Sequence, residues 1–157
     1  MKDNCHRLPE KTEARARSNV KGGYRKMLKK GINPAKTFVA VDTGASHKFR
    51  QAVPHMMPCL TSTRCKQFGW WISTVGRQVN LNELFRFQGI DPDTVGDWKG
   101  AGVTPKQMAH MIGNSITLAI SERTIGEALW ASGLVARKPH DLWATATQPG
   151  LPPTKDA

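Results

Sequence analysis

Residues 113–115, Gly-Asn-Ser, lie between two helical patterns and combine the residue types that suit a bend beside a polar ligand. Gly113 has no Cβ, so the backbone can turn there and a ligand can approach it closely. Asn114 and Ser115 offer hydrogen-bond donors and acceptors, and both can cap the helix that follows. The free N–H groups of that helix favour a carboxylate or a hydroxyl-rich ribose. The triplet therefore predicts a cofactor-binding bend, and a simple helix cap is the alternative.

The segment before this bend carries a full set of helix signals. Thr104 is a typical N-cap, Pro105 suits the first helical position, and Gln107 completes a reciprocal capping box. Gly113 is the expected end of the helix. The sequence thus predicts a helix over residues 104–113. Its expected buried stripe consists of Met108, Met111 and Ile112.

The segment after the bend predicts a helix from about residue 116 to residue 131. Its apolar residues fall on two faces, which favours a helix packed between layers at the edge of an α/β domain. One face holds Ile116, Ala119 and Ile120, and the other holds Leu118, Ile125 and Leu129.

A further helix is expected in the segment NLNELFRFQG. Asn80 can cap it, Glu83 stands at the reciprocal capping-box position, and Gly89 suits its end. Upstream, KTFVAVDTG predicts a short strand with a turn at residues 42–44, and FGWWISTV predicts a strand or a hairpin arm.

Two groups of residues in these predicted helices follow one another in a defined order. The first is an Arg, a Glu six residues later and then Arg-x-Gln-Gly; the second is a Gln six residues before Gly-Asn-Ser and an apolar helix. The pair resembles the last two sequence motifs of the DNA (cytosine-5) methyltransferases, in both order and spacing. The matching residues are Arg77, Glu83, Arg86, Gln88 and Gly89, then Gln107, Gly113, Asn114 and Ser115.

The resemblance implies the C-terminal piece of a Rossmann-like methyltransferase fold, an α/β fragment that is helix-rich with few short strands. In that family the final motif packs beside the first strand of the catalytic sheet and borders S-adenosyl-L-methionine. Gly113, Asn114 and Ser115 are therefore the implied cofactor-binding residues. The remaining motif residues are implied to be structural, with Arg77, Glu83 and Arg86 in an ion network that holds the recognition region on the catalytic core.

The resemblance extends upstream into PCLTSTR and the tryptophan pair that follows, so that it covers residues 54–131. This stretch is similar to the end of the family's target-recognition region, where a threonine lies near the phosphate of the target nucleotide. Thr61 matches that threonine. The other expected DNA contacts are Thr63, Arg64 and Lys66. Trp70 and Trp71 are expected in the core or an interface, with base stacking as the alternative.

The chain does not carry the family's catalytic loop. Pro58-Cys59 imitates its Pro-Cys pair, but Leu60 follows where the family has Gln, and no Glu-Asn-Val comes later. No Gly-rich loop follows a strand in the way that opens the main cofactor site. We therefore expect no catalytic residue here, and we expect a separate N-terminal catalytic half to supply the nucleophile and most of the methyl-donor site.

Charge is concentrated at the start of the chain. Of the 157 residues, the first 36 contain eleven Lys or Arg and three Asp or Glu, so they carry +8 of the net charge of +11. This imbalance favours a polyanionic partner, either nucleic acid or an anionic membrane surface. No apolar stretch is long enough to span a bilayer, and the charged N-terminus does not resemble a secretory signal. We expect an intracellular protein located with DNA, in the nucleus if it is eukaryotic and in the cytoplasm or nucleoid if it is bacterial or from a phage.

Four segments are expected along the chain. Residues 1–36 form a basic, helical or loosely ordered segment interrupted at Gly22-Gly23, and residues 37–76 are the end of a target-recognition-like region. Residues 77–135 hold the two motifs, and residues 136–157 form a flexible, Pro-rich tail.

Two other functions stay open at this level. The chain can be a non-enzymatic basic module that binds DNA or RNA, with the helices as a scaffold. It can also be a zinc or thiol enzyme that uses Cys59, although the spacing of Cys5, Cys59 and Cys65 fits no usual zinc pattern.

Overall fold

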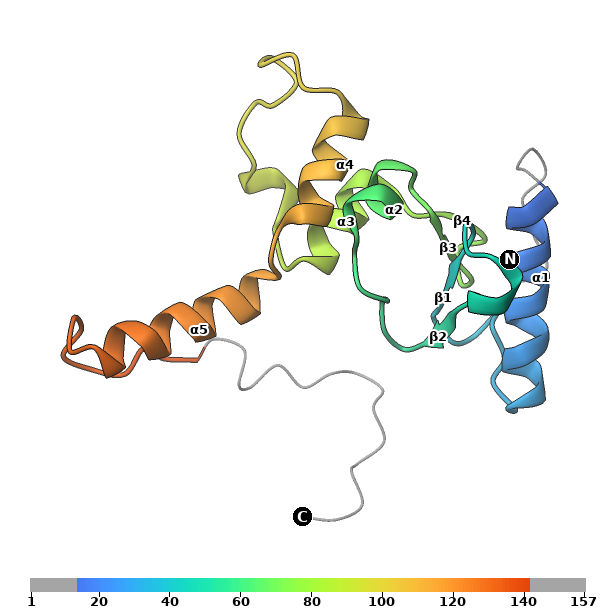
Figure 1. Ribbon diagram of the computed structural model, residues 1–157, viewed down its shortest axis with the longest axis horizontal. Helices are drawn as coiled ribbons and strands as arrows, with labels where there is room; N and C mark the ends of the chain where they lie inside the picture. Colours follow the sequence, from blue (N-terminus) through green and yellow to red (C-terminus); the bar gives the residue numbers. More distant parts are fainter. Residues whose placement is uncertain (1–13, 142–157) are drawn as a thin grey trace, which may run out of the picture.

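The computed structural model describes residues 14–141, which form a small, helix-rich α/β unit (Figure 1). Within that range there are five α-helices and one four-stranded antiparallel sheet. The helices are α1 (Ala14–Lys29), α2 (Ser62–Lys66), α3 (Leu81–Phe87), α4 (Pro105–Asn114) and α5 (Leu118–Ala131), with short 3₁₀ helices η2 (His47–Phe49) and η3 (Pro92–Thr94). The strands are β1 (Val39–Asp42), β2 (Ala52–Pro54), β3 (Trp70–Ile72) and β4 (Arg77–Gln78).

The strands lie in the order β2-β1-β3-β4, and each neighbouring pair is antiparallel. β1 is central, with Ala40 opposite Ile72 on one side and opposite Val53 on the other. β3 and β4 form the hairpin that FGWWISTV predicts. Gly76 adopts a φ of 64° in its turn, a conformation that favours glycine.

Successive residues of a strand point to opposite faces, and the tryptophan pair shows this alternation. Trp71 packs with Val39 and Val41 against α1, while Trp70 and Ile72 pack against α3 and α4. Both tryptophans are almost fully buried, so they are core residues in this chain. Their burial on opposite faces makes the sheet the middle layer between α1 and the helices α2, α3 and α4.

Helix α1 covers one face of the sheet and runs without a break through Gly22-Gly23, contrary to the predicted interruption. The glycines are there because the helix lies close to its neighbours. A Cβ at Gly23 would come within 3.1 Å of Val41 Cγ2, and one at Gly22 would collide with the Arg50 guanidinium. The helix ends as expected near Gly31, whose φ is 73°.

The helices α2, α3 and α4 cover the other face around the larger apolar core. α3 and α4 begin as predicted, because Asn80 and Thr104 each form a complete capping box, with Glu83 and Gln107 respectively. Gly89 follows α3 with a φ of 79°. The expected stripe of α4 needs one correction: Met111 is exposed, and Ala109 takes its place in the core beside Met108 and Ile112.

Helix α5 does not pack between layers. It projects away from the rest of the described chain (Figure 1), and Gly126 is its only buried residue. Ile120 and Ile125 are each 58% exposed, and Trp130 is 46% exposed. The two apolar faces that the sequence shows are real, but most of their larger side chains stay exposed, and residues 138–141 pack along only part of the helix, with Pro139 against Gly126.

Candidate cofactor and nucleic-acid site

The bend at residues 113–115 is not built as a cap for the following helix, which corrects the sequence prediction. Helix α4 continues through Gly113 to Asn114, and Ser115 is its C-cap, with Oγ donating to the Ile112 carbonyl at 2.7 Å. The next helix begins only at Leu118, after Thr117. Asn114 is exposed at the end of α4, so its amide is accessible beside the bend.

Gly113 is required by packing within this chain. A Cβ at this position would lie 2.6 Å from Ser62 N and 2.7 Å from the carbonyl carbon of Thr61, and both are backbone atoms. α4 therefore crosses the start of α2 at a distance that only glycine allows. This crossing brings a predicted cofactor residue, Gly113, directly against a predicted DNA contact, Thr61.

Gln88 connects the two motifs. Its side chain is buried, and Nε2 donates to the Ile112 carbonyl at 3.0 Å while Oε1 accepts from the Thr117 hydroxyl at 2.8 Å. Its backbone carbonyl also accepts from Leu118 N at 2.8 Å. The residue before the stop glycine of α3 thus holds both the end of α4 and the start of α5. The two motifs form one structural unit.

The expected ion network is an ion pair between two residues. Arg77 donates from both terminal nitrogens to the Glu83 carboxylate, at 2.8 and 2.9 Å, and Glu83 also closes the capping box with Asn80. The hydrogen bond to Glu83 raises the pKa of Arg77. Burial opposes ionisation of Glu83, yet hydrogen bonds from Arg77 and Asn80 and the charges of Arg77 and Arg86 hold its pKa below the usual range.

Arg86 contributes to this cluster only through its charge, and it lies exposed on α3. The Arg77–Glu83 pair is partly exposed, with 46% of the Arg77 side chain and 24% of the Glu83 side chain open to solvent. The three-residue ion network implied by the resemblance is therefore a partly exposed pair that fixes β4 to the start of α3.

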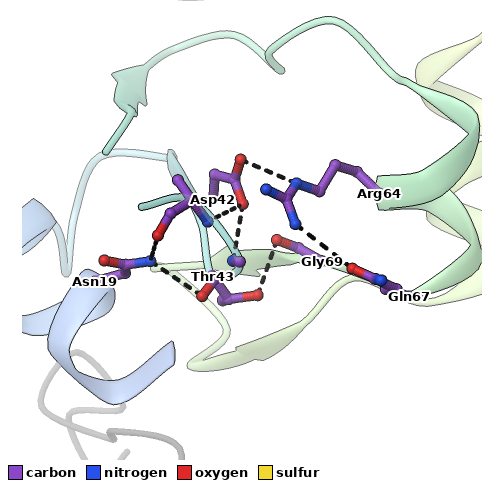
Figure 2. A network of polar contacts seen from close by, with 8 residues as sticks. Asn19, Asp42, Thr43, Arg64, Gln67 and Gly69 are labelled. Carbon is purple, nitrogen blue, oxygen red and sulfur yellow. Dashed lines mark hydrogen bonds and ion pairs between the residues drawn. The ribbon is translucent and has the colours of Figure 1, made fainter. Parts of the chain in front are cut away.

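Arg64 belongs to a polar network that joins α2 to the end of β1 (Figure 2). Its Nε lies 3.2 Å from the Asp42 carboxylate, which also accepts from the N–H groups of Gly44 and Ala45. The Arg64 side chain keeps 28% of its surface exposed. It can therefore stabilise the turn after β1 and still present part of its guanidinium to a ligand.

The four predicted DNA contacts are divided between two hollows. Thr61 and Arg64 line one of about 490 Å³, whereas Thr63 and Lys66 line another of about 550 Å³ together with Lys106 and His110 from α4. All four residues come from α2 or the residue before it. A five-residue helix thus contributes to two separate concave surfaces.

The cysteines do not provide an evident reaction centre. Cys59 is exposed on the rim of the first hollow. Burial, with a smaller contribution from Cys59, raises the pKa of the Cys65 thiol to about 11, so that it stays protonated near neutral pH. Within residues 14–141, no group of three His, Cys, Asp or Glu side chains is placed to hold a metal ion. Cys5 lies outside the described residues.

No protein-family model, no curated protein and no solved structure matches this chain. In the described part of the chain, no helix is both long and apolar enough to cross a membrane.

Sequence reasoning gave Gln88 a place in a motif but no role, and it gave Asn19 and Arg50 no role at all. Asn19 is buried and donates to the Thr43 and Ala45 carbonyls, and it accepts from Arg50 Nε at 3.0 Å. The only indication in the sequence that Asn19 has a structural role is its place as a polar residue on the apolar side of α1. Its partners lie more than 20 residues away, so no local pattern could identify them.

Proposed function

We propose that this chain is the C-terminal portion of a DNA (cytosine-5) methyltransferase. It completes the S-adenosyl-L-methionine and DNA sites of a catalytic half carried by another polypeptide or another part of a longer one. The full enzyme transfers a methyl group from S-adenosyl-L-methionine to C5 of cytosine in DNA. One observation carries the proposal: Gln88 joins the two motifs into a single unit whose bend is open to solvent at Asn114.

The uncovered faces of α5 support the proposal. An isolated apolar side chain on a surface is ordinary, but a helix with Ile120, Ile125 and Trp130 all exposed calls for a covering layer. In the proposed enzyme that layer is the mostly parallel, Rossmann-like sheet of the catalytic half. The antiparallel sheet of this chain then belongs to the target-recognition side.

The exposed groups at the bend fit a polar cofactor in their chemistry. Asn114 offers both a donor and an acceptor, and no part of residues 14–141 covers it. Ser115 Oγ donates to the Ile112 carbonyl and still has capacity to accept. In this proposal Gly113 serves mainly the α2–α4 crossing, and Asn114 and Ser115 border the methyl donor, which supplies the methyl group when bound.

The chemical step requires groups that the proposal assigns to the other half. That half provides the thiolate that attacks the target base, the acid that protonates it and most of the cofactor site. Cys59 is exposed, yet Arg64 beside its hollow is already paired with Asp42. A thiolate needs a cationic surrounding and a partner acid, and neither group is assembled around Cys59.

Complementation tests this function directly. The chain is co-expressed with a cognate N-terminal half, and methylation of genomic DNA should appear only when both parts are present. In the complemented enzyme, Asn114→Ala should weaken S-adenosyl-L-methionine binding severalfold in a calorimetric titration. Asn82→Ala, which removes an exposed amide from α3, is the matched control. Cofactor affinity that is identical in both variants would remove the pocket assignment.

A second candidate function is a non-enzymatic module that binds nucleic acid. It is favoured by the outer face of α1, where no acidic residue interrupts the Lys and Arg residues between positions 14 and 36. Deleting the basic segment cannot separate the two functions, because Val20 and Met27 of α1 are fully buried core residues. Replacing exposed Lys and Arg of α1 by Gln is the informative change. It should abolish binding under the second function and only weaken complementation under the first.

A further inference from the structure

The exposed side of α1 is rich in Lys and Arg, and its opposite, apolar side is packed on the sheet. Arg15, Lys21, Lys26 and Lys29 are exposed, while the apolar face of the helix is buried against the sheet. A basic amphipathic helix binds a membrane by placing its apolar face in the lipid, and that face is occupied here. The arrangement therefore favours nucleic-acid phosphates over a bilayer as the polyanion.

Arg50 extends this surface from outside the helix. Its guanidinium lies against Gly22, where any Cβ would collide with it, and its Nε donates to Asn19. Residues 15, 22, 26 and 29 share one face of a helix with 3.6 residues per turn. Arg50 thus fills the position that Gly22 leaves empty between Arg15 and Lys26. We call Arg15, Lys26, Lys29 and Arg50 the basic row.

An exposed aromatic residue directly precedes Arg50, the member of this row that lies outside α1. Phe49 is the last residue of η2, and Arg50 follows it. η2 lies beside α1 (Figure 1), and the Phe49 side chain is 69% exposed. Lys48 Nζ lies 5.7 Å from the centre of the ring. An exposed aromatic side chain among cations is the usual combination in sites that stack an unpaired base while holding the strand.

The hollow of about 490 Å³ adjoins the same ring. Phe49 lines it together with Gln51, Thr61 and Arg64, which offer donors and acceptors at its wall. Its volume lies within the range of small-ligand pockets, so a nucleobase has room to enter it. Stacking on Phe49 and hydrogen bonding to the wall are therefore available to one base at the same time.

We propose that Phe49 and this hollow bind an unpaired nucleobase, while the basic row binds the phosphates of the same strand. The inference rests on the proposed function only for the choice of DNA as the nucleic acid. It assigns to this chain a binding site for a single strand, or for a base displaced from a duplex, formed by η2, α1 and the segment before α2.

Binding by the full chain alone tests this site, with no methyl donor and no catalytic half. Fluorescence anisotropy is measured with a labelled 12-nucleotide single strand and with the matching duplex. Phe49→Ala should weaken single-strand binding about tenfold and leave duplex binding nearly unchanged, because stacking acts only on an unpaired base. Phe49→Trp should retain single-strand binding. Met56→Ala is the control, since it removes another exposed apolar side chain.

The basic row is tested by its salt dependence. Arg15→Gln and Lys26→Gln should each weaken binding to both strand forms and lower the slope of log affinity against log salt by about one. Lys99→Gln is the control, because Lys99 is exposed in the loop before α4. Circular dichroism on every variant establishes that the fold is retained.

Three results would overturn the inference. They are unchanged single-strand affinity in Phe49→Ala, an equal loss for single strand and duplex in that variant, and tighter binding to phosphatidylserine vesicles than to the single strand. The proposed methyltransferase function fails separately, if complementation gives no methylation while the Phe49-dependent binding is intact. Complementation without Phe49-dependent binding removes only the present inference.

Discussion

Helices α1 and α5 both combine apolar with charged side chains, and their environments are opposite. In α1, Val20 and Met27 have no exposed surface because the sheet covers them. In α5, Ile120 and Ile125 are more than half exposed, and the helix projects from the rest of the described chain (Figure 1). The comparison teaches that an apolar helical face predicts a covering surface but does not say which polypeptide supplies it.

The same contrast applies to the two proposed binding regions, the nucleic-acid site beside α1 and the cofactor site at the bend before α5. The α1 side is complete within this chain, so its basic row and Phe49 can be tested in isolation. The α5 side, with the bend at Asn114, is proposed to become complete only against a catalytic half. Mutations should therefore act differently on the two helices.

The largest expected effect contrasts the two helices directly. Met27→Ala should lower the free energy of unfolding by about 2–5 kcal/mol, because it leaves a cavity in the core beneath α1. Ile125→Ala in α5 should change it by less than about 0.5 kcal/mol, since the side chain is exposed. Urea unfolding followed by circular dichroism measures both. Comparable losses would mean that α5 is covered in solution, for instance by a second copy of the chain.

Gly113→Ala tests the crossing that places the bend. The new methyl group would meet the backbone of Thr61 and Ser62, so α4 would have to move or the chain would lose about 1–3 kcal/mol of stability. Gly96→Ala is the control, because a Cβ there meets no atom within 4 Å. Thermal unfolding reports the difference. Equal stability of the two variants would show that α4 does not lie this close to α2.

Gln88→Ala tests the link between the motifs. It removes the acceptor of the Thr117 hydroxyl and one donor to the Ile112 carbonyl, which keeps Ser115 as a partner, and losing these two hydrogen bonds should cost about 1–3 kcal/mol. Amide exchange should also become faster at Leu118, the first residue of α5, as its anchoring loosens. Gln67→Ala, at an exposed glutamine, is the control. Unchanged amide exchange at Leu118 in Gln88→Ala would show that the Gln88 side chain does not anchor the start of α5.

The smallest expected effect concerns the Arg77–Glu83 pair. The pKa of Glu83 is lower in the folded state, so its stabilising contribution is present above its unfolded pKa and is lost as the pH falls through the folded value. Because the pair is partly exposed, Arg77→Gln should cost under about 1 kcal/mol at pH 7. The difference from the native chain should shrink below about pH 4. A constant difference across that range would exclude the ion pair as its cause.

The local elements were largely predictable from sequence. The capping boxes at Asn80 and Thr104, the ends at Gly31 and Gly89 and the hairpin around Trp70-Trp71 all follow from residues within a few positions of one another. Such signals depend on backbone groups of one helix turn or one strand pair. Hence they can be interpreted without knowing what lies across the fold.

The predictions that were wrong concern features that depend on contacts between residues far apart in the sequence. Gly22-Gly23 was expected to interrupt a helix, because propensity alone penalises glycine, and tertiary contact with Val41 and Arg50 decides otherwise. Met111 was expected in the core and is exposed, since the position of α4 against α2 and α3 selects which side of the helix is covered. The packing between layers expected of α5 failed because the described residues 14–141 form no second layer over it.

By itself the sequence determined where α3 and α4 begin, how charge is distributed, and which two motifs occur in which order, because each of these depends on residues that are close together in the sequence. Only the tertiary structure decided that Gln88 joins the motifs, that Gly113 serves a helix crossing, and that Arg50 lies against Gly22 of α1. Those facts depend on atoms that are distant along the chain and adjacent in space, and no local pattern specifies that adjacency.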